Sequence, residues 1–276
     1  MNYGDYKEFK ITRSLGIRSL FTFSLREFQS GYIYKGEMHD FYEAVIIMRG
    51  KAVITAGKNV YSLSGGEMIL HPPRQFHNIS NESGENVSVL IFSFRARSFP
   101  EIEDGPIFKL SQKESDTLRG IYSDSLSVFV RDDVNISLAE GRQLDAEAII
   151  LRLELFLLSV ISEKNKREKP KRGKSSENYR NILSVMEKNL SADLSAEELA
   201  RLSQMSVSSL EKTVRRYSGY GARAYYNIMR MQRATELLLS GESVKGAALA
   251  VGFSDQNYFS ARYKKWCGGS PSKVKS

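Results

Sequence analysis

The sequence is short of cysteine, proline and long apolar runs. One cysteine in 276 residues excludes an internal disulfide framework and is typical of a reducing compartment. No apolar run approaches the ~18 residues that a membrane-spanning helix needs. The first residues are polar and acidic, which argues against a signal peptide. We therefore expect a cytoplasmic chain that crosses no membrane, and its length leaves room for about two domains.

Charge is distributed unevenly along the chain. From residue 164 onward there are 22 Lys and Arg against 10 Asp and Glu, whereas the first 163 residues hold 18 against 22. An acidic first part and a basic second part suit a chain that binds a small molecule at one end and a polyanion at the other. A solvated basic surface without a partner is the alternative if charge is considered alone.

The last third of the chain contains the pattern of a helix-turn-helix. Apolar residues of the segment 244–253 share one helical face, and Gly252 allows a tight turn where a Cβ would clash. Ser254 offers an N-cap for a second helix, which we expect to end at Gly268. We expect its buried stripe to consist of Tyr258, Phe259, Arg262 and Tyr263. In such a motif the second helix lies in the major groove of DNA.

The same pattern occurs one repeat earlier. Ser195 and Glu198 form a capping box that opens a helix, Met205 and Ser206 make the turn, and the segment 222–239 predicts a connecting helix. The buried stripe expected on the second helix of this copy is Val207, Leu210, Val214 and Tyr217. Equivalent positions stand 48 or 49 residues apart, and they are Ala200 with Ala248, Met205 with Phe253, Leu210 with Phe259, Val214 with Tyr263, and Gly219 with Gly268. So many anchors repeating in order indicate a duplicated motif.

Residues 194–272 resemble the tandem helix-turn-helix domain of the AraC family of bacterial transcription regulators. The resemblance depends on Met205 and Ser206, Arg230, Met231 and Ala234, Leu237 and Leu238, Val251 to Phe253, Asp255, Tyr258 to Ser260, Tyr263 to Lys265, Gly268, Ser270 and Pro271. It implies that the chain regulates transcription by binding double-stranded DNA, more often as an activator, with RNA polymerase as a candidate partner. Val214 departs from the usual Phe, and Gly246 from a common carboxylate.

The first hundred residues predict short strands separated by glycine turns. We expect strands near residues 20–23, 44–48, 53–55, 60–63, 68–70 and 87–94, with a hairpin at Gly57. This spacing predicts a small β-barrel or a double-sheet jelly roll. The stretch also resembles the cupin-like sensor domain of many AraC-family proteins, through His39, Tyr42, Glu43, Gly50, Tyr61, Leu63, Gly66, Glu67, Pro73 and His77.

Four polar residues of this barrel are candidate metal ligands. Cupins hold a metal with imidazole and carboxylate groups, and the resemblance places Glu37, His39, Glu43 and His77 at the corresponding positions. Glu37 stands where the first ligand is usually His, so the set could hold Zn, Mn or Fe, although no cofactor is certain. The alternatives are a hydrogen-bonded core or an effector pocket, in which His39, Tyr42, Glu43 and His77 would pair with the hydroxyls of a sugar-like molecule. We expect His71 to pack in the core.

Residues 110–161 change to helical periodicity. One helix is marked by Leu118, Ile121, Tyr122, Leu126 and Phe129, and a second by Ala146, Ile149, Ile150, Leu153, Phe156, Leu157 and Val160. The second stripe is so wide that either the barrel or a second copy of the chain must cover it. A helix here makes a dimer in the family that the chain resembles, and a homodimer is our hypothesis. Residues 164–177 are rich in Lys and Arg and predict a solvated linker.

Exposed positions of the two expected recognition helices are the candidate DNA contacts. Gln and Asn can bond bidentately to adenine, and Lys to guanine. The candidates for base edges are Ser208, Ser209 and Lys212 in the first motif and Gln256, Asn257, Ser260 and Ala261 in the second. The candidates for phosphate are Arg215, Arg216, Arg262, Lys264 and Lys265. Arg230 is expected to be structural, packing near the first motif or capping its carbonyls.

The sequence as a whole predicts an α+β multidomain chain with a cupin-like β-barrel or jelly roll, a helical dimerisation segment and an all-α tandem helix-turn-helix. The expected boundaries are 1–109 for effector sensing, 110–163 for dimerisation, 164–177 for the linker and 178–276 for DNA binding. We interpret it as a ligand-responsive transcription activator and not as an enzyme. The rival is a metal-dependent cupin enzyme fused to a DNA-binding tail, and a weaker one is an RNA-binding or architectural basic domain.

Overall fold

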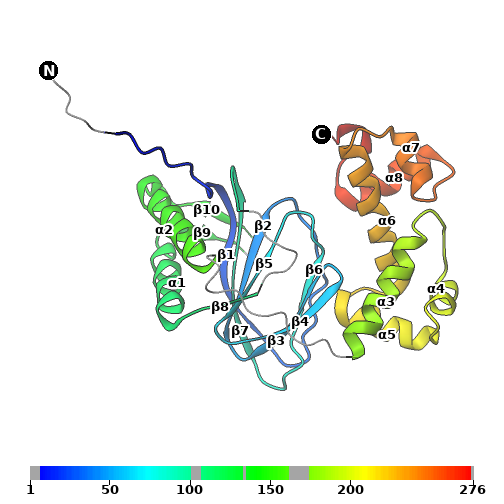
Figure 1. Ribbon diagram of the computed structural model, residues 1–276, viewed down its shortest axis with the longest axis horizontal. Coiled ribbons are helices and arrows are strands. Elements are labelled where there is room, and N and C mark those ends of the chain that lie inside the picture. The colour runs from blue at the N-terminus through cyan, green and yellow to red at the C-terminus, as the bar shows by residue number, and fades with distance from the viewer. Residues whose placement is uncertain (1–6, 101–106, 133–134, 162–173, 275–276) are drawn as a thin grey trace.

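The computed structural model describes residues 7–100, 107–132, 135–161 and 174–274. A β-rich part comes first in the chain, and a helical part follows and lies beside it (Figure 1). Within the described residues, no helix is both long enough and apolar enough to cross a membrane. The predicted division into a β-rich N-terminal part and a helical C-terminal part is confirmed.

The β-rich part contains two antiparallel sheets packed face to face. One has five strands in the order β1-β7-β2-β5-β8, and the other has three in the order β4-β3-β6. The bounds are β1 Ile17–Phe28, β2 Tyr42–Arg49, β3 Lys51–Ala56, β4 Asn59–Ser64, β5 Glu67–His71, β6 His77–Ser80, β7 Val87–Ala96 and β8 Ile107–Lys109. The expected hairpin is present, because Ala56 pairs with Asn59 across a two-residue loop in which Gly57 has a φ of 54°.

The five-stranded sheet is buried on both faces. Along β2, Ala44 and Ile46 belong to the core on one face, while Val45 and Ile47 belong to the core shared with the three-stranded sheet. This division follows from the two-residue period of a strand. A strand that is apolar at every position is therefore expected in the middle of this sheet.

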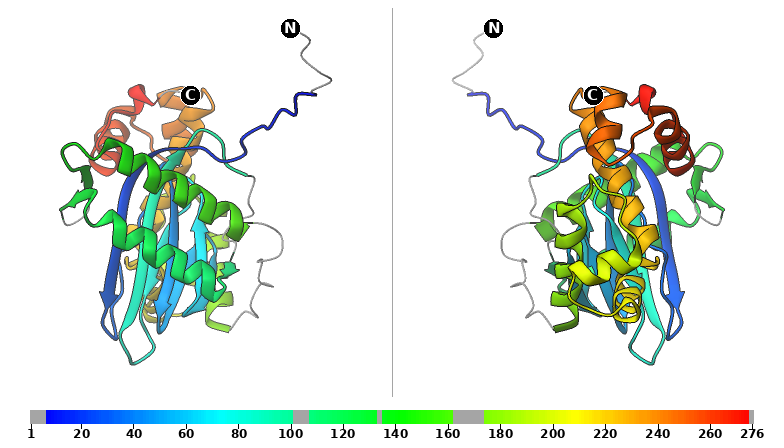
Figure 2. Two further views of the ribbon diagram at one scale, coloured as in Figure 1. Left: turned by 90° about the vertical axis from the view of Figure 1, so that its left-hand side faces the viewer. Right: turned by 90° about the vertical axis from the view of Figure 1, so that its right-hand side faces the viewer.

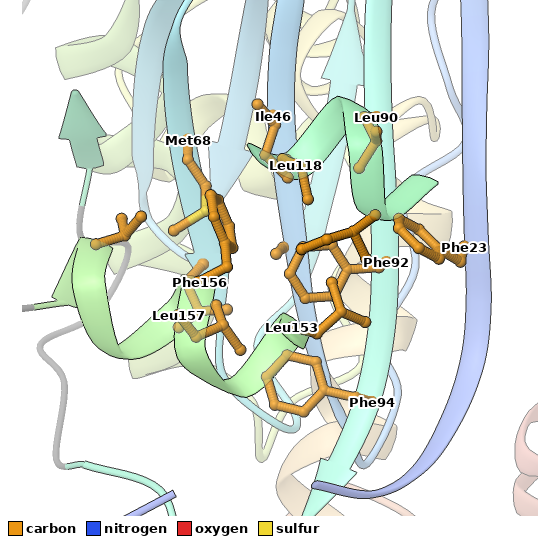
Figure 3. Close-up of a cluster of buried hydrophobic side chains, with 14 of the residues drawn as sticks. Phe23, Ile46, Met68, Leu90, Phe92, Phe94, Leu118, Leu153, Phe156 and Leu157 are labelled. Atoms are coloured by element: carbon orange, nitrogen blue, oxygen red, sulfur yellow. The ribbon is translucent and has the colours of Figure 1, made fainter. Parts of the chain in front are cut away.

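Helices α1 (Gln112–Ser125) and α2 (Gln143–Ile161) cover the face of the five-stranded sheet that lies away from the helical part (Figure 2). Figure 3 shows Leu153, Phe156 and Leu157 of α2 packed toward Phe92 and Phe94 of β7. The buried residues of α2 include Ile149, Leu153, Phe156, Leu157 and Val160. The apolar stripe predicted for this helix is thus covered by the barrel of its own chain.

The predicted extent of α1 is wrong at its end. Phe129 does not continue the helix but begins β9 (Phe129–Arg131), which pairs with β10 (Ile136–Leu138). The guanidinium of Arg131 binds the carbonyl oxygen of Ser125 at 3.3 Å and that of Phe23 at 3.1 Å. These bonds provide partners for the end of α1 and hold β9 against β1, so the helical spacing of Phe129 was coincidental.

The helical part contains the two predicted repeats joined by a connecting helix. The bounds are α3 Lys174–Lys188, α4 Ala196–Leu202, α5 Val207–Ser218, α6 Ala222–Leu239, α7 Val244–Ala250, α8 Gln256–Cys267 and the 3₁₀ turn Pro271–Lys273. Residues 164–173 of the expected linker lie outside the described residues. Helix α3 begins at Lys174, so the last four residues of the expected linker are helical.

The helix ends repeat with the same spacing as the apolar residues. Ser195 and Ser243 cap α4 and α7, and the capping box of Ser195 with Glu198 is present. The recognition helices α5 and α8 end at Gly219 and Gly268, at φ of 75° and 78°. Ser254 is not the cap of α8, however. Asp255 takes that role, and its Oδ1 accepts a hydrogen bond from the backbone N of Tyr258 at 2.6 Å, because a carboxylate is a stronger acceptor near a helix N-terminus.

Candidate ligand cavity and DNA interface

A cavity of about 270 Å³ lies between the two sheets. Strands β1, β2, β3, β5, β6 and β7 and the segment before β2 contribute its lining. The apolar lining includes Phe28, Val45, Ile54, Ile79 and Ile91, and the polar lining includes Thr22, Glu37, His39, Glu43, His71, His77 and Ser93. A mostly apolar cavity with a few converging polar groups is typical of a small-molecule site.

Four of the polar side chains form one cluster. The candidate ligand atoms of Glu37, His39, Glu43 and His77 all lie within 4.8 Å of one another. His77 Nε2 lies 3.3 Å from Glu43 Oε1 and 3.7 Å from Glu37 Oε1, and His39 Nε2 lies 3.6 Å from Glu43 Oε2. Backbone pairing sets this geometry, because an isolated bridge joins Glu37 to His77, the first residue of β6. The structure thus brings together the four residues that the sequence offered as candidate metal ligands.

Backbone carbonyls orient the two imidazole rings by binding their Nδ1 atoms. His39 Nδ1 lies 2.9 Å from the carbonyl oxygen of Phe41, and His77 Nδ1 lies 3.0 Å from that of Gln75. A carbonyl only accepts, so each Nδ1 carries its proton and each neutral ring has an unprotonated Nε2. Both Nε2 atoms are buried, and they lie 3.3–3.7 Å from the carboxylate oxygens of Glu37 and Glu43. When both rings are neutral, the cluster presents two imidazole lone pairs and two carboxylates to one point.

Charges within the cluster depend on one another. Burial by itself lowers the pKa of His77, but hydrogen bonds to Glu37 and Glu43 outweigh it and raise this pKa to about 10. Burial raises the pKa of Glu43, but hydrogen bonds from His39 and His77 outweigh it and hold this pKa far below its usual value. Burial, followed by the charge of His77, lowers the pKa of His71 to about 3. Without a bound cation, Glu43 is ionised, His77 is protonated and His71 is neutral at pH 7.

The exposed faces of α5 and α8 form the candidate DNA interface. Ser208, Ser209 and Lys212 are exposed on α5, and Gln256, Asn257 and Ala261 are exposed on α8. Ser260 is half-buried, and its hydroxyl donates to the carbonyl oxygen of Gln256 at 2.8 Å. Arg215, Arg262, Lys264 and Lys265 are exposed as well. Arg216 instead forms an ion pair with Glu82 of the β-rich part.

Two apolar residues expected in the buried stripes are exposed. Val207 is 37% exposed and Tyr258 is 58% exposed, whereas Leu210, Val214, Phe259 and Tyr263 are at most 1% exposed. Both exceptions lie in the first turn of a recognition helix, beyond the edge of the core that the two helices of a motif share. Arg262 is also exposed and does not belong to the stripe. These positions widen the surface that faces solvent at the start of each recognition helix.

Two family models match the two halves of this architecture. One, described as an AraC-like ligand binding domain, matches residues 25–155, and a helix-turn-helix domain matches residues 199–276. The chain belongs to the AraC family. The activator RhaS of Klebsiella pneumoniae (strain 342) is 23% identical over 240 residues, which cover 86% of this chain and 86% of RhaS.

A second RhaS protein and a solved structure are also similar to this chain. RhaS of Pectobacterium carotovorum (strain PC1) is 23% identical over 242 residues, with 86% of each chain covered. The solved structure of ToxT from Vibrio cholerae with a bound unsaturated fatty acid covers 93% of this chain and 95% of ToxT, at 15% identity and a TM-score of 0.38. The matched family models make this chain a DNA-binding transcription regulator with a ligand-binding domain.

The structure corrects two assignments within the AraC-type ligand-binding domain. Tyr42 does not line the cavity, because it precedes Glu43 on β2 and so points to the opposite face, where its ring stacks on Phe99 at 4.3 Å. His71 lines the cavity, although we expected it to pack in the core. Its ring stacks on that of His77 at a centroid distance of 4.4 Å.

Sequence reasoning missed the polar residues that β1 contributes to the cavity. Thr22, Ser24 and Arg26 alternate along this strand and all line the cavity. Thr22 Oγ1 lies 2.5 Å from Ser93 Oγ, which in turn donates to Glu43 Oε2 at 2.9 Å. The period-two polar pattern of β1 was the signal that could have found them.

Proposed function

We propose that this AraC-family chain is a transcription activator that binds two neighbouring segments of double-stranded DNA and responds to a small molecule in the cavity. The observation that carries the proposal is the duplicated, exposed pair of helices α5 and α8, each with hydrogen-bonding or basic side chains in its first turns. Because the rigid helix α6 joins the motifs, we expect them to contact DNA segments ~10 base pairs apart. DNA as the target also favours a cytoplasmic location, and activation would require contact with RNA polymerase.

Selection of bound sequences from random double-stranded DNA tests this function. We expect two conserved half-sites separated by about one helical turn. Binding that stays indifferent to sequence at moderate salt would contradict the proposal and favour an RNA-binding or architectural domain. The same assay with single-stranded RNA as competitor separates those two alternatives.

A homodimer formed through α2 is part of the proposal. Five residues of α2 repeat with heptad spacing and face solvent, and they are Leu144, Ala148, Leu151, Leu155 and Leu158. The four leucines are 80%, 51%, 68% and 42% exposed. An apolar seam with this spacing supports pairing with α2 of a second copy, since burying such leucines is favourable and one chain cannot do it alone. This seam differs from the stripe that the sequence indicated, which the barrel covers.

A polyhydroxylated molecule such as a sugar is our proposed effector. Carboxylate and hydroxyl groups at Glu37, Glu43, Thr22 and Ser93 can bond to hydroxyls, while the apolar lining contacts the less polar face of a sugar ring. A thermal-shift screen with a panel of carbohydrates tests this choice. We expect one of them to raise the melting temperature of the wild type but not that of Glu43→Gln.

A divalent cation is a second candidate for the cluster. Two imidazoles and two carboxylates suit Zn, Mn or Fe, and the Nε2 atoms of His39 and His77 face the carboxylates, so a bound cation would take the place of the proton on His77. Such an ion would balance the carboxylate charge and fix the segment around Glu37. Elemental analysis of the purified protein, compared with His77→Ala, tests it. A bound redox metal together with turnover of a substrate would instead favour the cupin enzyme.

A further inference from the structure

The first helix-turn-helix packs directly on the sensor domain. The end of α5 lies against β6 and the segment 34–37, on the outer face of the three-stranded sheet (Figures 1 and 2). Gly36 N donates to the carbonyl oxygen of Ser218 at 3.0 Å. A Cβ on Gly219 would lie 2.5 Å from the carbonyl oxygen of Tyr34, so this close approach requires glycine. The ring of Phe76 contacts that of Tyr225 at 4.8 Å.

Polar pairs surround this apolar contact. Lys58 Nζ lies 2.6 Å from Glu187 Oε2, and Arg180 donates to Asn59 Oδ1 at 2.9 Å. On another edge of the contact, Arg216 Nε donates to Glu82 Oε1 at 2.6 Å, and Arg216 Nη2 donates to Glu82 Oε2. The guanidinium of Arg216 is therefore held bidentately by a carboxylate of the sensor domain.

The Glu82 carboxylate occupies the two hydrogen-bond donors of Arg216 that a DNA phosphate would need. Arg216 lies on the recognition helix α5 and is a candidate phosphate contact. A guanidinium that donates two parallel hydrogen bonds to a carboxylate cannot donate the same two to a phosphate. The negative charge of Glu82 at the end of α5 would also repel a neighbouring phosphate. Binding of DNA by this end of α5 thus requires that the pair be broken.

We propose that the Glu82–Arg216 pair is an autoinhibitory latch, in which the sensor domain competes with DNA for the recognition helix of the first motif. The latch rests on the proposed function, because it assumes that α5 approaches a DNA backbone. Asn81 holds the loop that carries Glu82, since its Nδ2 donates to the carbonyl oxygens of Phe28 at 2.9 Å and Glu85 at 2.7 Å. Phe28 lines the ligand cavity, so the latch loop is anchored on the cavity wall.

The full-length variants Glu82→Gln and Glu85→Gln test the latch. Both remove one negative charge from the same exposed loop, but of these two glutamates it is Glu82 that forms an ion pair with Arg216 of α5. We expect Glu82→Gln to lower the dissociation constant for the selected DNA site by roughly threefold to tenfold, and Glu85→Gln to change it less than twofold. Fluorescence anisotropy at two salt concentrations measures both constants.

Measuring Glu82→Gln and Glu85→Gln again in an Arg216→Ala background isolates the contribution of the Glu82–Arg216 pair to the dissociation constant. The gain from Glu82→Gln should disappear there, because Arg216 is no longer available to DNA. Equal effects of the two Glu variants in the wild-type background, or an undiminished gain without Arg216, would overturn the latch while leaving the proposed function intact. A wild type without sequence-selective binding would overturn the proposed function and the latch together.

Discussion

Arg230 Nε donates a hydrogen bond to the carbonyl oxygen of Val251 at 2.8 Å. Arg230 Nη2 donates to the carbonyl oxygen of Gly252 at 3.1 Å, and the side chain is 2% exposed. The expected structural role is confirmed, but its place is corrected, since Arg230 caps the turn of the second motif and not of the first. An ion pair with Asp193 at 2.7 Å ties the same guanidinium to the residues before α4.

We predict that Arg230→Leu lowers the free energy of unfolding by about 2–6 kcal/mol, because two carbonyl groups lose their donors at about 1–3 kcal/mol each. Urea denaturation measures the change. Arg233→Leu is the control on the same helix, since Arg233 is exposed and pairs with the exposed Glu236 three residues on. Its effect should stay within about 0.5 kcal/mol. Similar losses for both variants would show that Arg230 does not hold the second motif.

Asn257→Ala should relax base preference. Asn257 is exposed in the first turn of α8, where its amide can bond bidentately to adenine, at about 1–3 kcal/mol of discrimination. We expect roughly a tenfold to hundredfold loss on the selected site and little change on random DNA, measured by competition binding. Equal losses on both DNAs would contradict the base contact.

Lys264→Ala should weaken binding to all sequences alike. Lys264 is exposed in the last turn of α8, and a phosphate contact there carries no sequence information. We expect the slope of log affinity against log salt to fall by about one unit. Lys113→Ala makes the same charge change on α1, far along the chain from the recognition helices, and should leave the slope unchanged. An unchanged slope for Lys264→Ala would remove this residue from the interface.

Leu155→Arg should dissociate the proposed homodimer. Leu155 is 68% exposed in the middle of the α2 seam, and a charge buried there without a partner is unfavourable. Sedimentation of the full chain at tens of micromolar should show dimer for the wild type and monomer for the variant. Val130→Arg replaces another exposed apolar residue, on β9, and should remain dimeric. A monomeric wild type would contradict the proposed homodimer.

Stability should depend on pH through the cavity cluster when metal is removed with a chelator. The pKa of His77 is raised from 6.5 to about 10, so its contribution is full below pH 6.5 and is lost as pH rises toward 10. The pKa of Glu43 is lowered from 4.5, so its contribution is present above pH 4.5 and is lost as pH falls through its lower folded value. We expect the melting temperature to decline from about pH 7 to pH 10, and less steeply in His77→Asn. If the melting temperatures of the wild type and of His77→Asn declined equally with pH, the predicted contribution of His77 would be contradicted.

The features that were predicted best from the sequence are those that depend on neighbouring residues. Caps at Ser195 and Gly219, the hairpin at Gly57 and the repeat of apolar positions need only a few neighbouring residues, and the structure contains all of them. The cluster of Glu37 and His77 was found through resemblance, since 40 positions separate them and only strand pairing brings them together.

The features that could not be predicted from the sequence depend on contacts between residues far apart in the chain. Tyr42 could be assigned to the cavity because residue type does not reveal which face of a strand points inward. Arg230 was placed at the first motif, because chain position suggested it and only the fold brings Val251 close. Arg216 looked like its neighbour Arg215, and only the docking of α5 distinguishes them.

Phe76 and His77 are adjacent, yet one packs on the DNA-binding helices and the other lines the cavity. A partition one strand thick therefore divides the two compartments, and neighbouring residues can belong to different sides. Engineering of new chemical specificities could thus vary inward positions such as His71, His77 and Ile79 while the outward ones stay fixed. A biosensor built in this way would change what it detects and keep the promoter that it reads.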